Sequence, residues 1–120
     1  MKKIFSAALF FCAGIVMVSS CKKDKGKIPI TSQSFCDSLQ VKYSVHIQPV
    51  IQSQCAISGC HTSGASMGDF TTYSGVKAKV DNGSFENRVL TLSNMPPVGP
   101  LPDSTKKKID CWLKAGAPNN

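Results

Sequence analysis

The chain is short and moderately basic. It has 120 residues, with 14 Lys or Arg against 7 Asp or Glu, so its net charge is +7. This length allows one small domain rather than several. The positive charge is not accompanied by a nucleic-acid-binding motif, so we expect no nucleic-acid partner.

The N-terminus is typical of a secretion signal. Two lysines precede an apolar run over residues 4–18, whose 15 residues fall short of the roughly 20 that a membrane-spanning helix needs. Small residues then lead directly into Cys21, a pattern that resembles a lipobox. We therefore predict a lipoprotein signal peptide over residues 1–20 and a lipidated Cys21. The alternative is an ordinary signal peptide cut nearby.

A lipidated cysteine predicts where the mature chain resides. Several acyl chains on one residue give stable membrane association, so we expect the cell envelope, on the exported side (periplasm or outer membrane). Residues 21–34 are rich in Lys, Ser, Pro and Gly and lack apolar periodicity, which predicts a flexible basic tether. Its lysines suit anionic headgroups, and a merely solvated linker is the alternative. The folded domain is expected over residues 35–120.

The first helices of this domain precede and follow a cysteine-rich loop. One is expected to start between Ser44 and Ile47, with Ser44 as N-cap, and to deliver Cys55 at its C-terminal end. Another is expected over residues 73–80, capped by Thr72.

The remaining elements follow an Asp-Asn-Gly turn over residues 81–83. Ser84 is expected to cap a short helix that continues to Leu90. Residues 91–100 contain three prolines and a glycine, which predicts an irregular loop.

The last helix is the clearest. It is expected to follow Pro102 and to end at Gly116, with an apolar stripe of Ile109, Trp112 and Leu113. These patterns together predict an all-α domain of three to four short helices with irregular loops. Phe85 and Trp112 are expected in its core.

The most informative stretch is Cys55-Ala-Ile-Ser-Gly-Cys60-His61, which Met95 follows downstream within Met-Pro-Pro. Two thiols can add to the vinyl groups of a haem, the adjacent imidazole can bind its iron, and a later thioether can close the other side. The usual motif has two residues between the cysteines, whereas four stand here. This departure affects attachment through Cys55 more than ligation by His61.

Each of these residues has an alternative interpretation. An exported protein can also join Cys55 to Cys60 in a local disulfide, with His61 at the surface. Zinc is disfavoured because its sites usually combine two pairs of ligands. Met67 lies six residues after His61, too near to reach the opposite face of a haem. His46 is interpreted as a solvent-facing helix residue.

The six cysteines fit an oxidising compartment. Cys12 would be removed with the signal peptide, Cys21 would carry the lipid, and Cys55 and Cys60 belong to the motif. Cys36 and Cys111 therefore remain. Both stand near the ends of the folded region, which often approach each other in a compact domain. We predict a Cys36–Cys111 disulfide, with two buried free thiols as the alternative.

The chain resembles the small c-type cytochrome domains of bacterial envelope lipoproteins, particularly of the Bacteroidota type, from about residue 41 to residue 120. The resemblance rests on the order and spacing of several short pieces of sequence. They are Tyr43 to Ile51 leading into Cys55, Gly59-Cys60-His61, Thr72-Tyr73 with the helix after it, Met95-Pro96-Pro97, Leu101 eleven residues before Trp112, and the closing residues 115–120.

The resemblance implies a fold, a cofactor and a function. The fold would be a compact helical cytochrome c. Cys55 and Cys60 would bind haem c through thioethers, His61 would be the proximal iron ligand and Met95 the distal one. A six-coordinate iron has no open position, so we expect an electron carrier and not an enzyme. Its partners would be redox proteins of the envelope, the membrane and the cytochrome c maturation machinery.

Alternatives remain open at this point. Arg88 is a candidate partner of a haem propionate, with a solvated surface charge as the other interpretation. A haem-free lipoprotein, stapled by a disulfide within the motif and by Cys36–Cys111, would act as a binding or structural module. A copper-binding protein would use the same Cys, His and Met side chains, which suit copper.

Overall fold

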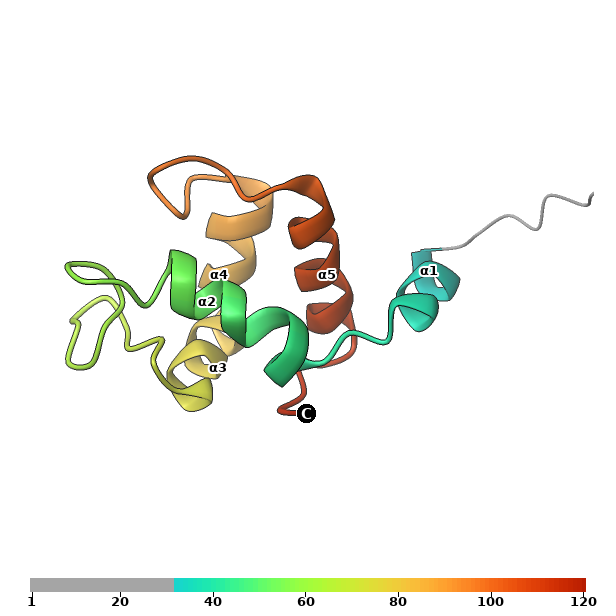
Figure 1. Ribbon diagram of the computed structural model, residues 1–120, viewed down its shortest axis with the longest axis horizontal. Helices are drawn as coiled ribbons and strands as arrows, with labels where there is room; N and C mark the ends of the chain where they lie inside the picture. The colour runs from blue at the N-terminus through green and yellow to red at the C-terminus, as the bar shows by residue number, and fades with distance from the viewer. Residues whose placement is uncertain (1–31) are drawn as a thin grey trace, which may run out of the picture.

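The computed structural model describes residues 32–120, so the predicted signal peptide, the predicted lipidation site Cys21 and most of the predicted tether lie outside the described residues. The described chain is helical (Figure 1). Its elements are α1 (Ser32–Leu39), the π-helix η1 (Tyr43–Ile47), α2 (Gln48–Gln54), α3 (Tyr73–Asp81), α4 (Ser84–Glu86), the π-helix η2 (Asn87–Thr91) and α5 (Asp103–Lys114). Residues 32–120 contain no strand, which confirms the predicted all-α class. No helix in this range is long and apolar enough to cross a membrane.

η1 and α2 follow each other directly and lead to the cysteine motif. The predicted N-cap is corrected: Lys42, in an extended conformation, precedes the helix, and Ser44 lies inside it. The first amides are satisfied by Asn120 instead. Tyr43 N donates to the side-chain Oδ1 of Asn120 at 2.8 Å, and Ser44 N donates to the backbone carbonyl oxygen of Asn120 at 2.9 Å. α2 ends one residue before Cys55, as predicted.

α3 has the predicted cap, because Thr72 Oγ1 accepts a hydrogen bond from Gly75 N at 3.2 Å. The helix ends at Asp81. At the next helix the predicted cap is wrong. Gly83, with a φ of +76°, is the N-cap, and Ser84 is the first helical residue. The Ser84 hydroxyl donates back into the preceding turn, so it does not cap the helix.

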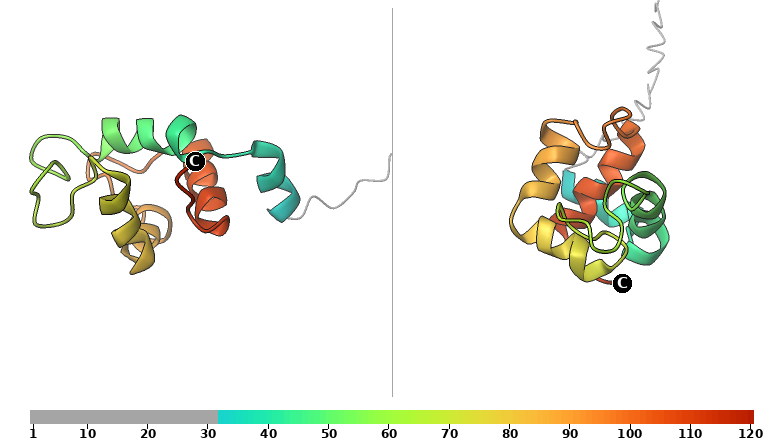
Figure 2. Two further views of the ribbon diagram at one scale, coloured as in Figure 1. Left: turned by 90° about the horizontal axis from the view of Figure 1, so that it is seen from below. Right: turned by 90° about the vertical axis from the view of Figure 1, so that its left-hand side faces the viewer.

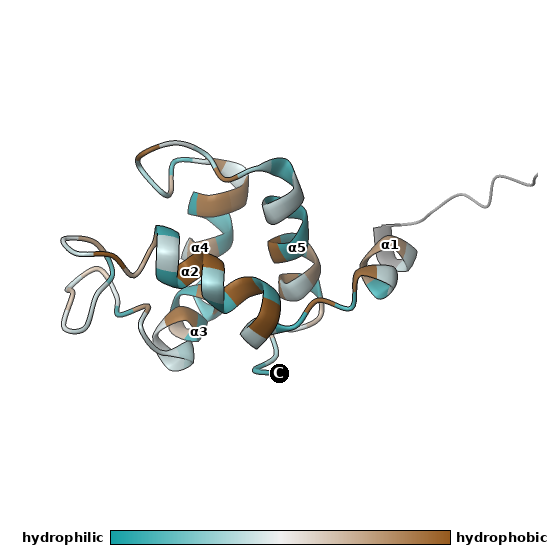
Figure 3. Cartoon of the chain, viewed as in Figure 1, coloured by the Kyte–Doolittle hydropathy of each residue, from teal (hydrophilic) through white to brown (hydrophobic). Residues whose placement is uncertain are grey.

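α5 supplies the centre of the core. Ile109 and Trp112 are 1% and 0% exposed, and Leu113 is half-buried. The Trp112 indole N–H donates to the Pro118 carbonyl oxygen at 2.9 Å. Phe85, which is buried, packs on Trp112 with ring centroids 6.4 Å apart. Figure 3 shows hydrophobic bands interrupted by hydrophilic ones on η1, α2 and α5, the pattern of helices with one apolar side.

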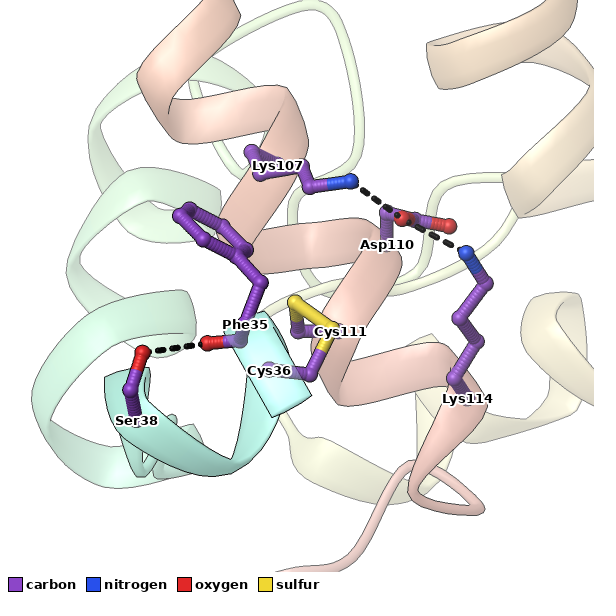
Figure 4. The surroundings of a disulfide bond; sticks show 7 residues. All are labelled: Phe35, Cys36, Ser38, Lys107, Asp110, Cys111 and Lys114. Carbon is purple, nitrogen blue, oxygen red and sulfur yellow. Dashed lines mark hydrogen bonds and ion pairs between the residues drawn. A yellow bond between two sulfur atoms is a disulfide. The ribbon is translucent and has the colours of Figure 1, made fainter. Parts of the chain in front are cut away.

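The sequence does not predict α1, which begins at Ser32, inside the segment interpreted as a tether. α1 lies beside α5, at the opposite end of the fold from the loop after α2 (Figure 1, Figure 2). The Cys36–Cys111 disulfide joins α1 to α5 (Figure 4). Phe35 remains 36% exposed, and the Lys107 ammonium lies 5.4 Å from its ring centroid. The disulfide therefore holds α1 against α5, and none of the core residues in the described chain comes from α1.

Candidate functional site

A cavity of about 510 Å³ opens beside the end of α2, and its volume is within the range of about 300–1,000 Å³ typical of cofactor sites. Its walls come from the end of α2, the loop after it, α3, α4, η2 and the loop before α5. Cys55, Cys60, His61 and Met95, the four residues predicted to bind haem, all line it. The fold therefore brings together side chains that stand 40 positions apart in the sequence.

The four residues between Cys55 and Cys60 include a tight turn. Cys60 N donates to the Ile57 carbonyl oxygen at 3.0 Å. Gly59 has a φ of +80°, a left-handed conformation that favours glycine. His61 N then donates to the Cys55 carbonyl oxygen at 3.1 Å. The long spacer therefore returns the histidine to the end of α2 instead of carrying it away.

Both motif cysteines are free thiols in the structure, so they are not joined to each other. Cys55 is buried, whereas Cys60 is half-buried. Burial, followed by the neighbouring Cys60, raises the pKa of the Cys55 thiol to about 11. Metal ions bind the thiolate, so a bare metal would have to displace the proton of this buried thiol. A thioether to a cofactor carbon leaves the buried sulfur uncharged.

Two neighbours fix the His61 ring. Its Nδ1 lies 3.0 Å from the Gly68 carbonyl oxygen. Because a carbonyl oxygen only accepts, Nδ1 carries the proton and Nε2 keeps the lone pair that binds a metal. The ring also stacks on Phe70, with centroids 4.1 Å apart and planes at 9°. Phe70 N donates to the His61 carbonyl oxygen at 2.9 Å, so one short segment orients both backbone and imidazole.

Met95 reaches the cavity from the loop between η2 and α5. It is half-buried against the core, and the buried Pro96 follows it through a cis peptide bond. Asn94 N donates to the Arg88 carbonyl oxygen at 3.0 Å, which ties the start of the loop to η2. The thioether of Met95 and the imidazole of His61 therefore reach the cavity from separate segments of the chain.

One of the two competing ligands also lies at the cavity. Met67 lines it and is 57% exposed, so the structure brings two methionines to the site. His46 is not part of the lining. It is partly exposed, and its Nδ1 accepts a hydrogen bond from Lys42 N at 3.0 Å at the start of η1.

The cavity lining is positively charged, and only one of its two cations, Arg88, was a candidate from the sequence. Lys79 from α3 and Arg88 from η2 line it, and no Asp or Glu does. Neither is among the ion pairs of the described residues. Each follows a buried residue, Val76 or Phe85, by three positions, which places it near the side of the helical segment that faces the core.

The lining combines metal-ligating, apolar and cationic side chains. Within residues 32–120, no group of three or more His, Cys, Asp or Glu could hold a metal ion. The cavity instead combines one imidazole, two thiols, two thioethers, apolar rings and two cations. Comparison of the chain with protein-family models, curated proteins and solved structures finds no match.

Proposed function

We propose that this chain is a lipid-anchored c-type cytochrome that carries single electrons through one covalently bound haem. The observation that carries the proposal is the convergence of Cys55, Cys60, His61 and Met95 on one cavity. A c-type haem requires two thiols and an imidazole, and a thioether completes the axial ligands. The hydrogen bond from His61 Nδ1 to Gly68 leaves Nε2 for the iron.

Each residue has a defined role in this proposal. Cys55 and Cys60 hold the haem through thioethers, and His61 Nε2 and Met95 Sδ bind its iron. The haem supplies a one-electron Fe(III)/Fe(II) couple, whose potential methionine ligation raises. Phe70 restrains rotation of the imidazole by stacking on it. With His61 and Met95 both reserved for the iron, the haem would serve electron transfer, and we expect no enzymatic turnover.

The remaining parts of the proposal concern the cell envelope. Cys21 carries the lipid, and the basic segment after it links the anchor to the domain. The cytochrome c maturation machinery attaches the haem. Electrons pass to and from redox partner proteins on the exported side of the membrane.

A haem-free lipoprotein module is the second candidate, and the Cys36–Cys111 disulfide suits it. This candidate also needs a disulfide between Cys55 and Cys60, whereas both are free thiols in the structure. A copper site ranks third. A bare cation would meet two positive side chains and no carboxylate at the cavity wall, and the raised pKa of the Cys55 thiol opposes thiolate ligation.

Covalent haem retention tests the proposal. The chain is produced together with the maturation machinery, and haem is measured after acid–acetone extraction. The wild type and a Cys36→Ser/Cys111→Ser control, which removes two cysteines outside the cavity, should retain haem. A Cys55→Ser/Cys60→Ser variant should lose it. A wild type without retained haem would refute electron transfer through haem and favour the haem-free module.

A further inference from the structure

The two cations at the cavity wall have no role in attaching the haem or binding its iron. Lys79 and Arg88 come from different helices, α3 and η2, and reach the same cavity. With no carboxylate in the lining, the positive potential inside the cavity attracts anionic groups. The rest of the wall includes the rings of Phe70 and Phe85. An occupant that fits this wall is largely apolar and carries negative charge at its edge.

Arg88 is held by the loop that carries Met95. With the Asn94 amide oxygen facing the guanidinium, Arg88 Nη1 donates to it at 3.1 Å, and the amide nitrogen donates to the Arg88 carbonyl oxygen at 3.3 Å. This contact uses one of the five N–H groups of the guanidinium. The planar fork therefore keeps donors for a carboxylate, which it can bind through two parallel hydrogen bonds.

Lys79 is placed on the side of the cavity that carries His61. A Cβ built on Gly68 would lie 2.7 Å from Lys79 Cε, so the lysine side chain passes against this glycine. The carbonyl oxygen of the same glycine accepts the His61 Nδ1 hydrogen bond. Lys79 therefore lies beside the segment that orients the histidine, whereas Arg88 is tied to the segment of Met95.

We propose that Lys79 and Arg88 form a binding site for the two propionate carboxylates of the haem in this cavity. The inference rests on the proposed function, because it concerns the same cavity. Arg88 binds one carboxylate through its fork, and Lys79 binds the other as a point charge. The edge of the haem that bears the propionates is not the edge that Cys55 and Cys60 hold by its vinyl groups. The two pairs of residues together fix the orientation of the haem.

Charge-removing variants test this site. Arg88→Gln and Lys79→Gln are compared with Lys108→Gln, which makes the same charge change on α5 outside the cavity lining. All are produced with the maturation machinery. Haem retention, midpoint potential and the propionate bending bands of the resonance Raman spectrum are then measured. Arg88→Lys tests whether charge without the fork is enough.

We expect all four variants to retain haem. Arg88→Gln and Lys79→Gln should each shift the propionate bands and lower the equilibrium constant for reduction about threefold, because removal of a nearby positive charge disfavours the Fe(II) state. Lys108→Gln should behave as wild type, and Arg88→Lys should be intermediate.

The haem measurement separates the failure of this inference from the failure of the proposed function. Retained haem, with potentials and propionate bands in Arg88→Gln and Lys79→Gln equal to those of Lys108→Gln, would overturn the carboxylate site alone. A wild type without haem would overturn both. Should Arg88→Gln fail to fold, unchanged propionate bands in Lys79→Gln and Arg88→Lys would overturn the site.

Discussion

His61 Nδ1 lies 3.0 Å from the Gly68 carbonyl oxygen, and this contact determines which nitrogen of the histidine can bind a metal. The proton on Nδ1 is committed to the backbone, so Nε2 is the available ligand atom. Gly68 has a φ of +120°, a conformation that other residues adopt only with strain. The availability of the ligand atom therefore depends on a glycine seven positions further along the chain.

Gly68→Ala should destabilise the fold by about 1–3 kcal/mol, because alanine is strained at this φ. Lys79 Cε, which lies 2.7 Å from the position of the added Cβ, belongs to the end of a flexible side chain and can move away. Gly64→Ala is the matched control. Gly64 also has a positive φ, +78°, and has nothing within 4 Å of an added Cβ. Gly64→Ala should therefore lower the free energy of unfolding by only about 1 kcal/mol. Urea unfolding measures both. Equal losses would show that the φ of Gly68 strains alanine no more than the φ of Gly64 does.

Met95→Ala should change the absorption spectrum of the haem protein and lower its midpoint potential, because the thioether ligand stabilises Fe(II). Met67→Ala is the control, since Met67 also lines the cavity but is 57% exposed. It should leave both spectrum and potential unchanged. The opposite pattern, with Met67→Ala altering the spectrum and Met95→Ala silent, would assign the distal position to Met67.

The free Cys55 thiol predicts a pH dependence of stability in the chain produced without haem. Burial raises its pKa from 9.0 to about 11. The folded state therefore favours the neutral thiol, so the stability it contributes is complete below pH 9 and is lost as the pH rises toward 11. The loss is on the order of 2–3 kcal/mol. Urea unfolding between these pH values measures it.

Two controls accompany this measurement. Cys55→Ala should reduce the alkaline loss of stability, because it removes this titrating group; the remaining loss comes from the Tyr43 hydroxyl, whose pKa burial also raises. The haem-loaded wild type should show the same reduction, because a thioether does not titrate. A haem-loaded chain that still loses the same stability over this range would mean that Cys55 is not attached to haem.

Removing the Cys36–Cys111 disulfide should lower the free energy of unfolding by about 4–5 kcal/mol, because the bond closes a long loop in the unfolded chain. The loop spans 75 positions. Cys36→Ala/Cys111→Ala is the test variant, and urea unfolding is the measurement. Phe35→Ala keeps the disulfide but removes the ring near Lys107, and should cost no more than about 1 kcal/mol. A disulfide-free variant as stable as Phe35→Ala would contradict this account.

Local patterns in the sequence predict much of the fold. The Thr72 cap, the inward side of α5 and the helix that ends before Cys55 follow from capping residues and apolar spacing. The Ser44 cap failed because Asn120, 76 positions away, satisfies the first turn of η1. Such a contact between distant segments leaves no local signal.

The site was predictable as a set of residues but not as a geometry. The motif indicates which side chains belong to it, whereas the Gly68 carbonyl and the ring of Phe70 act through the fold. Lys79 escaped notice because a lone lysine in a helix is usually a solvated charge. The turn with Gly59 at positive φ, which accommodates the long spacer, is also invisible to a motif that counts residues.

The pyridine haemochrome spectrum of the purified chain, produced with the maturation machinery and washed with acid–acetone, tests the central claim most directly. The account predicts a c-type α band at the position typical of two thioether bonds, and a displaced band in Cys55→Ala, where one thioether remains. A wild-type chain that shows no haemochrome band after extraction would contradict the account.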